Sequence, residues 1–276
     1  MKRMFVATAL AAACVLSFAQ TTPTAEDVGK QMRELGWLKP GAIASVAGKA
    51  EFKGSPTYTF LGEADTDKFL KLNGNPPAGH SYTIAPTQSN WFAILHFAPE
   101  GYIKDDEKID AEALLKTLKE QNAQGNEAKR KQGYEALVME GWAIPPRYDT
   151  ESKRLEWGTK LRAEDKSLVV NVSTRILGRS GFTSAILVTS PETVEADLAD
   201  FKKSLKDFDY VKGEKYSEWK QGDKVAAYGL GALVLGGAAA VATSKGAFKA
   251  IGLAIAAGAA AVWAFVKKLL GRRNAS

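Results

Sequence analysis

Two long uncharged segments near the C-terminus constrain this chain more than any other feature. Residues 225–243 contain no charged side chain, and a second apolar segment covers residues 250–266. An apolar helix of about 17–25 residues is long enough to cross the roughly 30 Å hydrocarbon core of a bilayer. We therefore expect residues 223–276 to form a membrane anchor, with the lipid bilayer as its partner.

The sequence leaves the number of membrane spans open. If both segments cross as a hairpin, residues 244–249 form its turn and the basic cluster at 267–273 lies outside the cell. If only 250–266 crosses, that cluster lies inside, as Lys and Arg beside a span usually do, and 225–243 packs without spanning. Both segments are rich in Gly and Ala, which lets helices approach closely. They are expected to pack on each other or to mediate self-association.

The N-terminus has the three parts of a secretory signal peptide. A basic start, Met1-Lys2-Arg3, precedes an apolar stretch from residue 5 to residue 18, and Ser17-Phe18-Ala19 supplies a small-x-small cleavage site. We expect a signal peptide over residues 1–19, removed after Ala19, rather than lipid attachment at Cys14. Because Cys14 is the only cysteine, the cleaved chain would have no disulfides and no cysteine metal ligands.

The net charge of +6 does not indicate nucleic-acid binding. Seven of the 37 Lys and Arg residues lie in 223–276, which contains one acidic residue, whereas acidic and basic side chains nearly balance in residues 20–222. The basic excess therefore flanks the membrane segments, where it sets orientation and meets anionic lipid. We expect residues 20–222 to face the periplasm from a bacterial inner (plasma) membrane.

Residues 20–222 are long enough for one domain with its own core, and their patterns predict an α+β fold. Apolar and polar residues alternate strictly in 154–162 and 168–177, which is typical of an antiparallel sheet with one buried and one solvated face. Helices are expected at 24–35, 66–72, 111–132 and 190–208, and strands at 42–46, 56–61, 81–86, 91–98, 135–142, 154–162, 168–177 and 182–189. We predict a largely antiparallel sheet with helices packed on one face, followed by a C-terminal membrane helix or helical hairpin.

Two boundaries depend on local features. Pro145-Pro146 is expected to end the strand at 135–142, because proline cannot donate a ladder hydrogen bond. Residues 214–222 are expected to link the domain to the membrane, which would hold the domain close to the lipid surface.

No recognised catalytic motif occurs. The chain has no Gly-rich phosphate loop, nucleophile elbow or His-Glu-x-x-His, and two separated histidines, His80 and His96, do not make a zinc site without other ligands. We expect no metal and no cofactor. Three polar clusters are candidate sites, and their members are Asp105 and Asp106, then Arg147, Tyr148 and Asp149, then Asn171, Arg175 and Arg179.

Each cluster also has a simple structural interpretation. The first is a solvated turn before a helix, the second a rigid proline turn, and the third the wet face of a sheet. Arginine is nevertheless suited to binding carboxylate or phosphate. The carboxylates and arginines could also converge as a hydrolytic site, which requires direct or single-water contact between them.

A series of short motifs runs in one order along nearly all of the mature chain. They are Leu72-Asn73-Gly74-Asn75-Pro76, Gly101-Tyr102-Ile103-Lys104-Asp105-Asp106, Gly141-Trp142 with Pro146-Arg147-Tyr148-Asp149, Arg175-Ile176-Leu177-Gly178-Arg179-Ser180-Gly181, and Asp223-Lys224-Val225-Ala226-Ala227-Tyr228-Gly229-Leu230. In these motifs the chain resembles a family of predicted bacterial membrane-anchored proteins built on a domain of unknown function. The resemblance implies a secreted domain with a C-terminal anchor, and it implies no activity and no catalytic residue.

The anchor and the lack of a catalytic motif favour a non-catalytic, membrane-anchored periplasmic module that binds a ligand or another envelope protein. Two alternatives stay open. One is a hydrolase-like cell-envelope enzyme with a site near Asp105, Asp149 and Arg175. The other is a structural membrane component assembled through the Gly/Ala-rich helices.

Overall fold

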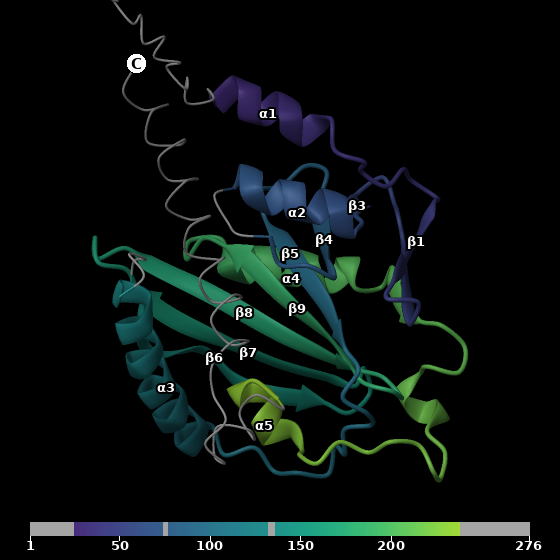
Figure 1. Ribbon diagram of the computed structural model, residues 1–276, viewed down its shortest axis with the longest axis vertical. Coiled ribbons are helices and arrows are strands. Elements are labelled where there is room, and N and C mark those ends of the chain that lie inside the picture. Colours follow the sequence, from purple (N-terminus) through teal and green to yellow (C-terminus); the bar gives the residue numbers. More distant parts are fainter. Residues whose placement is uncertain (1–24, 74–76, 132–135, 238–276) are drawn as a thin grey trace, which may run out of the picture.

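The computed structural model describes residues 25–73, 77–131 and 136–237 (Figure 1). The expected signal peptide, including Cys14, lies outside these residues. So do residues 238–276, which hold the end of the first apolar segment and all of the second.

A seven-stranded antiparallel sheet forms the centre of the fold, as the alternating patterns predict. Its strands, in spatial order, are β3 (Tyr58–Leu61), β4 (Ser81–Pro86), β5 (Phe92–Ala98), β9 (Phe182–Thr189), β8 (Leu168–Leu177), β7 (Arg154–Arg162) and β6 (Val138–Asp149). A second sheet has the order β1 (Ile43–Val46), β2 (Ala50–Lys53) and β10 (Phe208–Tyr210). The α+β class with antiparallel sheets is therefore confirmed. The sequence did not predict β2 and β10, which are only four and three residues long.

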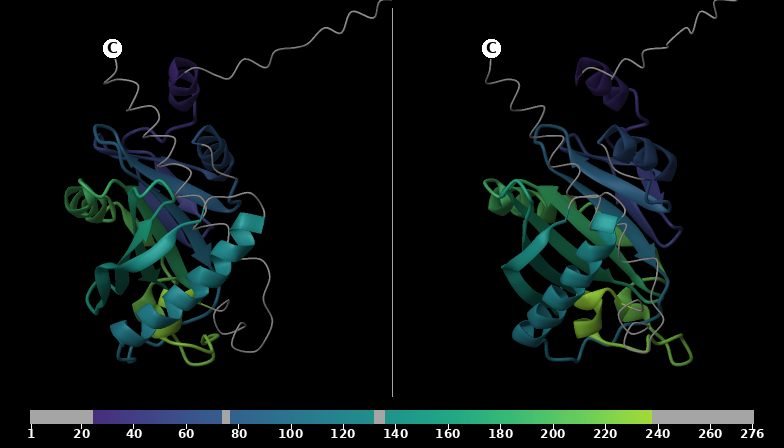
Figure 2. Two further views of the ribbon diagram at one scale, coloured as in Figure 1. Left: turned by 90° about the vertical axis from the view of Figure 1, so that its left-hand side faces the viewer. Right: turned by 60° about the vertical axis from the view of Figure 1, so that its left-hand side comes forward.

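Helices lie on both faces of the large sheet, so the prediction of one helical face is wrong. The helices α1 (Ala25–Arg33), α2 (Glu63–Leu72) and α3 (Ala111–Lys131) lie on one side, and α4 (Val194–Ser204) lies on the other (Figure 2). Phe201 of α4 packs edge-on against Trp91 at 5.7 Å, in a core that the small sheet also covers. Both faces of the sheet are therefore apolar enough to need a cover.

The strand β6 continues through the prolines that were expected to end it. It runs from Val138 to Asp149 at the edge of the sheet and changes register between Met139 and Gly141, and twice more before Arg147. Proline is tolerated on an edge strand or at a bulge, because an outward N–H has no partner to lose. Pro145-Pro146 therefore bends this edge strand without ending it.

The expected linker at 214–222 is part of the folded domain. The Glu214 carbonyl accepts a 2.8 Å hydrogen bond from the Arg179 N–H, and Lys215 forms a β-bridge with Gly178. Tyr216 is buried, and its hydroxyl donates to the Ile103 carbonyl at 2.7 Å. This segment thus ties the end of the chain to the sheet.

The first apolar segment also begins on the domain. Val225 forms a parallel β-bridge with Tyr102, and Leu230 and Leu233 of α5 (Leu230–Leu235) are fully buried beside the sheet. Gly101 permits this close approach, because it has a φ of +99° and a Cβ there would lie 2.8 Å from the Lys224 carbonyl oxygen.

The helix α5 ends at Gly236, whose φ of 114° lies in the left-handed region that favours glycine. The described part of the segment, residues 225–237, is therefore a β-bridge and a short packed helix, not a continuous helix. None of the helices in 25–73, 77–131 and 136–237 combines the length and the apolar character that crossing a membrane requires.

Candidate functional site

Asp105 and Tyr148, two of the predicted site residues, lie in direct contact. The Tyr148 hydroxyl donates to Asp105 Oδ2 at 2.8 Å, and Lys153 Nζ donates to the same oxygen at 2.9 Å. Tyr148 comes from β6, and Lys153 from the turn after it, where its φ is 54°. The sequence did not single out Lys153, because only the turn geometry brings it to Asp105.

The electrostatics of this contact do not favour proton transfer. Burial acts to raise the pKa of Asp105, but hydrogen bonds from Lys153 and Tyr148 hold it below its ordinary value. Burial and the Asp105 carboxylate raise the pKa of Tyr148 well above its ordinary value. At neutral pH Asp105 is ionised and Tyr148 is protonated, whereas a general acid or base needs a pKa near the working pH. The contact therefore joins two segments of the chain by hydrogen bonds and is not suited to proton transfer.

Aromatic rings connect this hydrogen-bonded contact to residues 216–219. The Tyr102 ring stacks on Tyr216 at 4.4 Å and lies 5.3 Å from Trp219. Lys153 Nζ lies 5.0 Å from the Tyr216 ring centroid, within cation–π range. The arrangement joins the loop after β5, the β6–β7 turn and residues 216–219.

Arg147 points to the opposite face of the sheet from its neighbour Tyr148. Its Nε donates to Glu156 Oε1 at 3.0 Å, and Lys202 of α4 binds the same carboxylate at 3.0 Å. Glu156 is one of the polar residues of the alternating segment 154–162, whose polar side was expected to be solvated, but it is buried. Successive residues of a strand alternate between faces, so Arg147 and Tyr148 cannot share one site.

The other acidic and basic candidates, Arg175 aside, bind partners outside this contact or are exposed. Asp149 closes its own turn, accepting from Ser152 Oγ at 2.7 Å, and Asp106 is exposed. Arg179 makes a double ion pair with Asp223, with N–O distances of 2.6 and 2.7 Å. The predicted carboxylates and arginines therefore do not converge on one hydrolytic site.

Arg175 is the exception among the predicted arginines, because it lies among aromatic rings. Its Nη1 donates to Ser184 Oγ at 2.8 Å, and the guanidinium lies 4.8 Å from the Trp157 ring and 5.7 Å from Phe182. Burial lowers the pKa of Arg175 to about 10, and the charge of Glu100 opposes that shift. Arg175 is therefore charged at neutral pH, on a face that is not the wet surface expected from the sequence.

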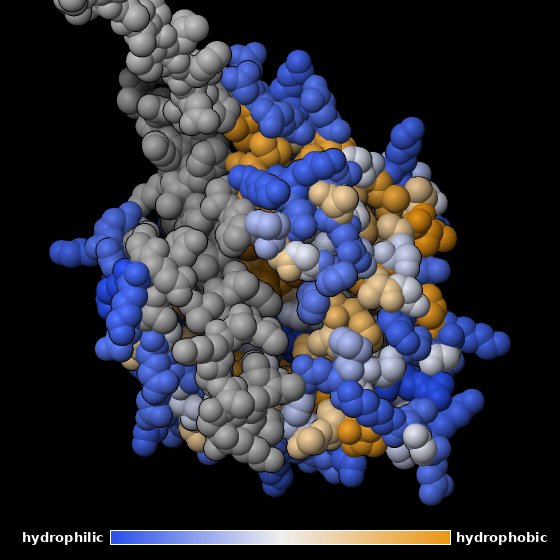
Figure 3. Space-filling model, viewed as in Figure 1, coloured by the Kyte–Doolittle hydropathy of each residue, from blue (hydrophilic) through white to orange (hydrophobic). Residues whose placement is uncertain are grey.

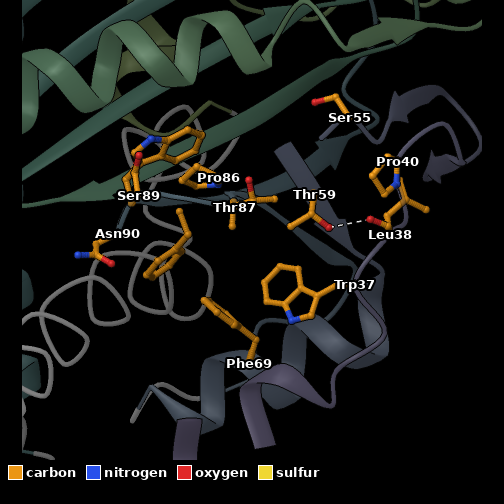
Figure 4. Close-up of a pocket in the computed structure, with 13 residues that line it drawn as sticks. Trp37, Leu38, Pro40, Ser55, Thr59, Phe69, Pro86, Thr87, Ser89 and Asn90 are labelled. Carbon is orange, nitrogen blue, oxygen red and sulfur yellow. Dashed lines mark hydrogen bonds between the residues drawn. The ribbon is translucent and has the colours of Figure 1, made fainter. Parts of the chain in front are cut away.

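A cavity of about 450 Å³ lies beside α2, between the segment after α1 and the β4–β5 hairpin (Figure 4). Four aromatic residues line it, Trp91 among them, and the other three are in ring contact. Trp37 meets Phe69 edge-on at 5.9 Å, and Phe69 meets Phe92 edge-on at 4.9 Å. Thr59 Oγ1 donates to the Leu38 carbonyl at 2.9 Å, which holds the segment after α1 against β3. Polar side chains, which include Thr87, Ser89 and Asn90, complete the lining.

The sequence did not predict this cavity. Its lining comes from four separate stretches, residues 37–40, 55–59, 69 and 85–92. None of these carries a motif, and the aromatic residues among them are equally typical of an ordinary core. Only the packing of α2 beside the β4–β5 hairpin brings them together.

A family model described as "Protein of unknown function (DUF2167)" matches residues 38–269. The chain belongs to the DUF2167 family. This confirms the resemblance to a family built on a domain of unknown function. In this DUF2167 chain the match begins at Leu38, beside the cavity, and covers every strand of both sheets.

A search of curated proteins returned no match to this DUF2167 chain. Among solved structures it is similar to the solution structure of cyanobacterial PsbP (CyanoP) from Synechocystis sp. PCC 6803. The sequence identity is 10%, the match covers 63% of this chain and 95% of that chain, and the TM-score is 0.34. At that TM-score the similarity supports no argument about this chain.

Proposed function

We propose that this protein is a non-catalytic binding module, tethered to the bacterial inner membrane with its folded domain in the periplasm. The leader pattern at 1–19 and the apolar segment at 250–266 support the location. Self-association through the Gly/Ala-rich segments stays a prediction, and residues 238–266 of these segments lie outside the described part of the chain.

The aromatic cavity is the observation that carries the binding role. Its volume of about 450 Å³ falls within the roughly 300–1,000 Å³ of small-molecule sites. Such sites combine apolar and aromatic walls with a few polar groups that orient the ligand. The cavity therefore suits an apolar ligand with a flat or aromatic part, which can pack edge-on or offset against Trp37, Phe69 and Phe92.

The same lining argues against catalysis in the cavity. None of the 13 described residues that line it carries a titratable side chain. General acid–base chemistry needs a titratable group within hydrogen-bond reach of the reacting atom. The geometry therefore supports binding without conversion.

Filling the cavity tests the binding role. Ala85 is partly buried and lines the cavity, so Ala85→Leu places extra methyl groups inside it, whereas Gln88→Leu adds the same side chain on the exposed loop nearby. We expect 5-fluoroindole, followed by ¹⁹F NMR on the full-length protein in nanodiscs, to bind the wild type and Gln88→Leu equally. Ala85→Leu should lose most of that binding. Equal binding by all three proteins would refute the cavity as the site.

Labelling of a surface cysteine tests the location. Val138 is 53% exposed, and Val138→Cys should react with a membrane-impermeant maleimide in intact spheroplasts. Reaction only after lysis would contradict a periplasmic domain. The wild type serves as the control, because labelling of the wild type would show that Cys14 is retained.

A further inference from the structure

On the side of the large sheet that carries α2 and α3, the central strands present side chains that are only partly buried. The helix α2 packs beside β4 and α3 beside β6, and β8 and β9 lie between them (Figure 1). The antiparallel register aligns three rows of side chains across the central strands β5, β9 and β8. The rows are Phe92–Val188–Asn171, Ile94–Ile186–Ser173 and His96–Ser184–Arg175. We call these nine residues the sheet floor.

Most of the sheet floor is only partly buried. Side chains of α2 reach Phe92 and Ile94 from one side, while the core under α3 and α5 holds Trp157 and Phe182 on the other. Ile186, with Ser173 and Arg175 beside it, keeps partial exposure between these two cores. The space-filling view shows a small hydrophobic recess near the centre of this side, between the grey atoms and hydrophilic side chains (Figure 3).

The sheet floor is chemically divided. Its β5 and β9 columns are mainly apolar, with Ile94, Ile186 and Val188, whereas its β8 column is polar. In the β8 column Asn171 Oδ1 is buried without a hydrogen-bond partner among the described residues. A buried polar atom left without a partner costs free energy, so a ligand that donates to or reorients Asn171 would gain affinity.

Arg175 gives the sheet floor a positive charge that has no ion pair among the described residues. Within the described ranges no carboxylate lies within 4.0 Å of its guanidinium, whereas Arg147 and Arg179 each pair with one. The Glu100 charge acts on Arg175 without an ion-pair contact. Only Nη1 donates in the structure, to Ser184 and weakly to the Thr174 carbonyl. A planar guanidinium with donors to spare is suited to a carboxylate or phosphate.

We propose that the sheet floor binds a single-chain amphiphile with an acidic head group. The head group binds Arg175, and the chain lies over Ile94 and Ile186 toward Phe92. Strands lie about 4.8 Å apart and rise about 3.4 Å per residue, so the two apolar columns match the width of one acyl chain. Phe92 also lines the aromatic cavity, so this inference rests on the proposed binding role and names the ligand class.

A photo-reactive side chain on the sheet floor tests this ligand. Ile186→benzoylphenylalanine in the full-length protein, irradiated in membranes, should give an adduct whose mass fits one acyl chain with an acidic group. That mass also separates a fatty acid from a lysophospholipid. Val138→benzoylphenylalanine, on the exposed start of β6, provides the background.

The arginine variants supply the decisive comparison. Arg175→Met should lower the adduct yield by about tenfold or more, and Arg175→Lys by less, because a charged hydrogen bond is lost or weakened. Arg147→Met, on the opposite face, should leave the yield unchanged. Near-UV circular dichroism checks that each variant folds. If Arg175→Met does not fold, the lower adduct yield expected for Arg175→Lys still tests the proposal.

Four results would overturn the proposal: an adduct with residues 238–276, an adduct with a two-chain lipid, no adduct above background, or a yield independent of Arg175. Loss of 5-fluoroindole binding in Ala85→Leu with the Ile186 adduct intact would separate the two proposals. In that case the cavity and the sheet floor are independent sites.

Discussion

Two tyrosine hydroxyls in this domain lie in opposite circumstances. Tyr148 donates to the ionised Asp105 at 2.8 Å, while the Tyr228 hydroxyl is buried and, among the residues described, has no hydrogen-bond partner. A hydrogen bond to a charged group stabilises a fold, and an unsatisfied buried hydroxyl destabilises it. The same chemical change should therefore have opposite effects at the two positions.

We expect Tyr148→Phe to lower the free energy of unfolding by about 1.5–3 kcal/mol, because it removes a hydrogen bond to a carboxylate. Tyr228→Phe should leave the stability unchanged or raise it. Thermal unfolding in a mild detergent, followed by near-UV circular dichroism, measures both. Equal losses in the two variants would show that packing, not hydrogen bonding, determines the effect.

The pKa of Asp105 predicts a pH dependence. Because its folded pKa lies below the ordinary value of 3.8, its stabilising contribution is present above that value and is lost as the pH falls through the folded pKa. Asp105→Asn should therefore be less stable than the wild type at pH 7, with the difference shrinking below pH 3.8. A difference that grew in acid would contradict the ion pair with Lys153.

The sequence predicted part of the cluster around Asp105. The motif that holds Asp105 and the motif that holds Tyr148 were both visible in the sequence, and the fold joins them. The contacts of Lys153 and Tyr216 with this cluster were not predicted, because a turn with positive φ and a ring stack across more than 100 residues have no local pattern. For the same reason Arg175 was expected on a wet face, although Trp157 and Phe182 flank it.

At the scale of elements, α5 shows why an apolar segment is ambiguous. Leu, Val, Ala and Gly suit a membrane helix and a buried helix equally, and an apolar stretch of about 10–14 residues more often belongs to a core. Periodicity could not locate the end of α5 at Gly236, since glycine occurs throughout the segment. The contacts of Leu230 and Leu233 with the sheet core show that α5 is a buried helix of the domain.

Leu233→Ala tests whether α5 belongs to the domain. Leu233 is fully buried, and a buried Leu→Ala change costs about 2–5 kcal/mol. The unfolding temperature of the domain should therefore fall by about 4–20 °C. Leu235→Ala, at a partly exposed position of the same helix, should cost less. An unchanged unfolding temperature for Leu233→Ala would mean that α5 is not part of the folded domain in solution.

The long edge strand β6 carries its own protection. Two prolines and three changes of register against β7 make the strand irregular, which hinders pairing of its free edge with another chain. Replacing both prolines, Pro145→Thr with Pro146→Thr, should increase aggregation on mild heating, as measured by light scattering. Pro191→Thr, in the loop before α4, is the control and should not aggregate faster. Equal scattering by all variants would show that the register changes alone protect the edge.

At the scale of the whole molecule, ion pairs fasten residues 213–224 to both sheets. Lys49, in the β1–β2 turn, binds Glu214 at 2.6 Å, and Arg179, two residues after β8, binds Asp223 at 2.6 Å. Arg179 holds the pKa of Asp223 at about 2, against an ordinary value of 3.8. This contribution to stability is present above pH 3.8 and is lost as the pH falls toward 2.

Acid should therefore release residues 213–224 before it unfolds the sheets. Limited proteolysis with pepsin should cut the wild type in this segment at pH 2 but slowly at pH 4. Asp223→Asn should be cut readily at both values. Asp209→Asn removes an exposed ion pair with Lys215, which is worth little, and should behave like the wild type. Cleavage elsewhere first would contradict a local release.

The overall architecture was largely predictable, whereas its layering was not. Alternating patterns located the strands of the large sheet, since a strand between a core and water repeats every two residues. The second face was missed because Glu156 looked solvent-facing in the sequence. Its burial depends on Arg147 and Lys202, which approach from other elements.

The packing of residues 214–237 gives the fold a mechanical property. If the C-terminus is held in a membrane, a pulling force on residue 237 meets α5 and the Tyr102–Val225 bridge before it reaches the seven-stranded sheet. Detaching this stretch would release roughly 80 Å of extended chain, at about 3.4 Å per residue. The domain could then move that far from its tether without unfolding its sheet, so the attachment is short at rest and extensible under load.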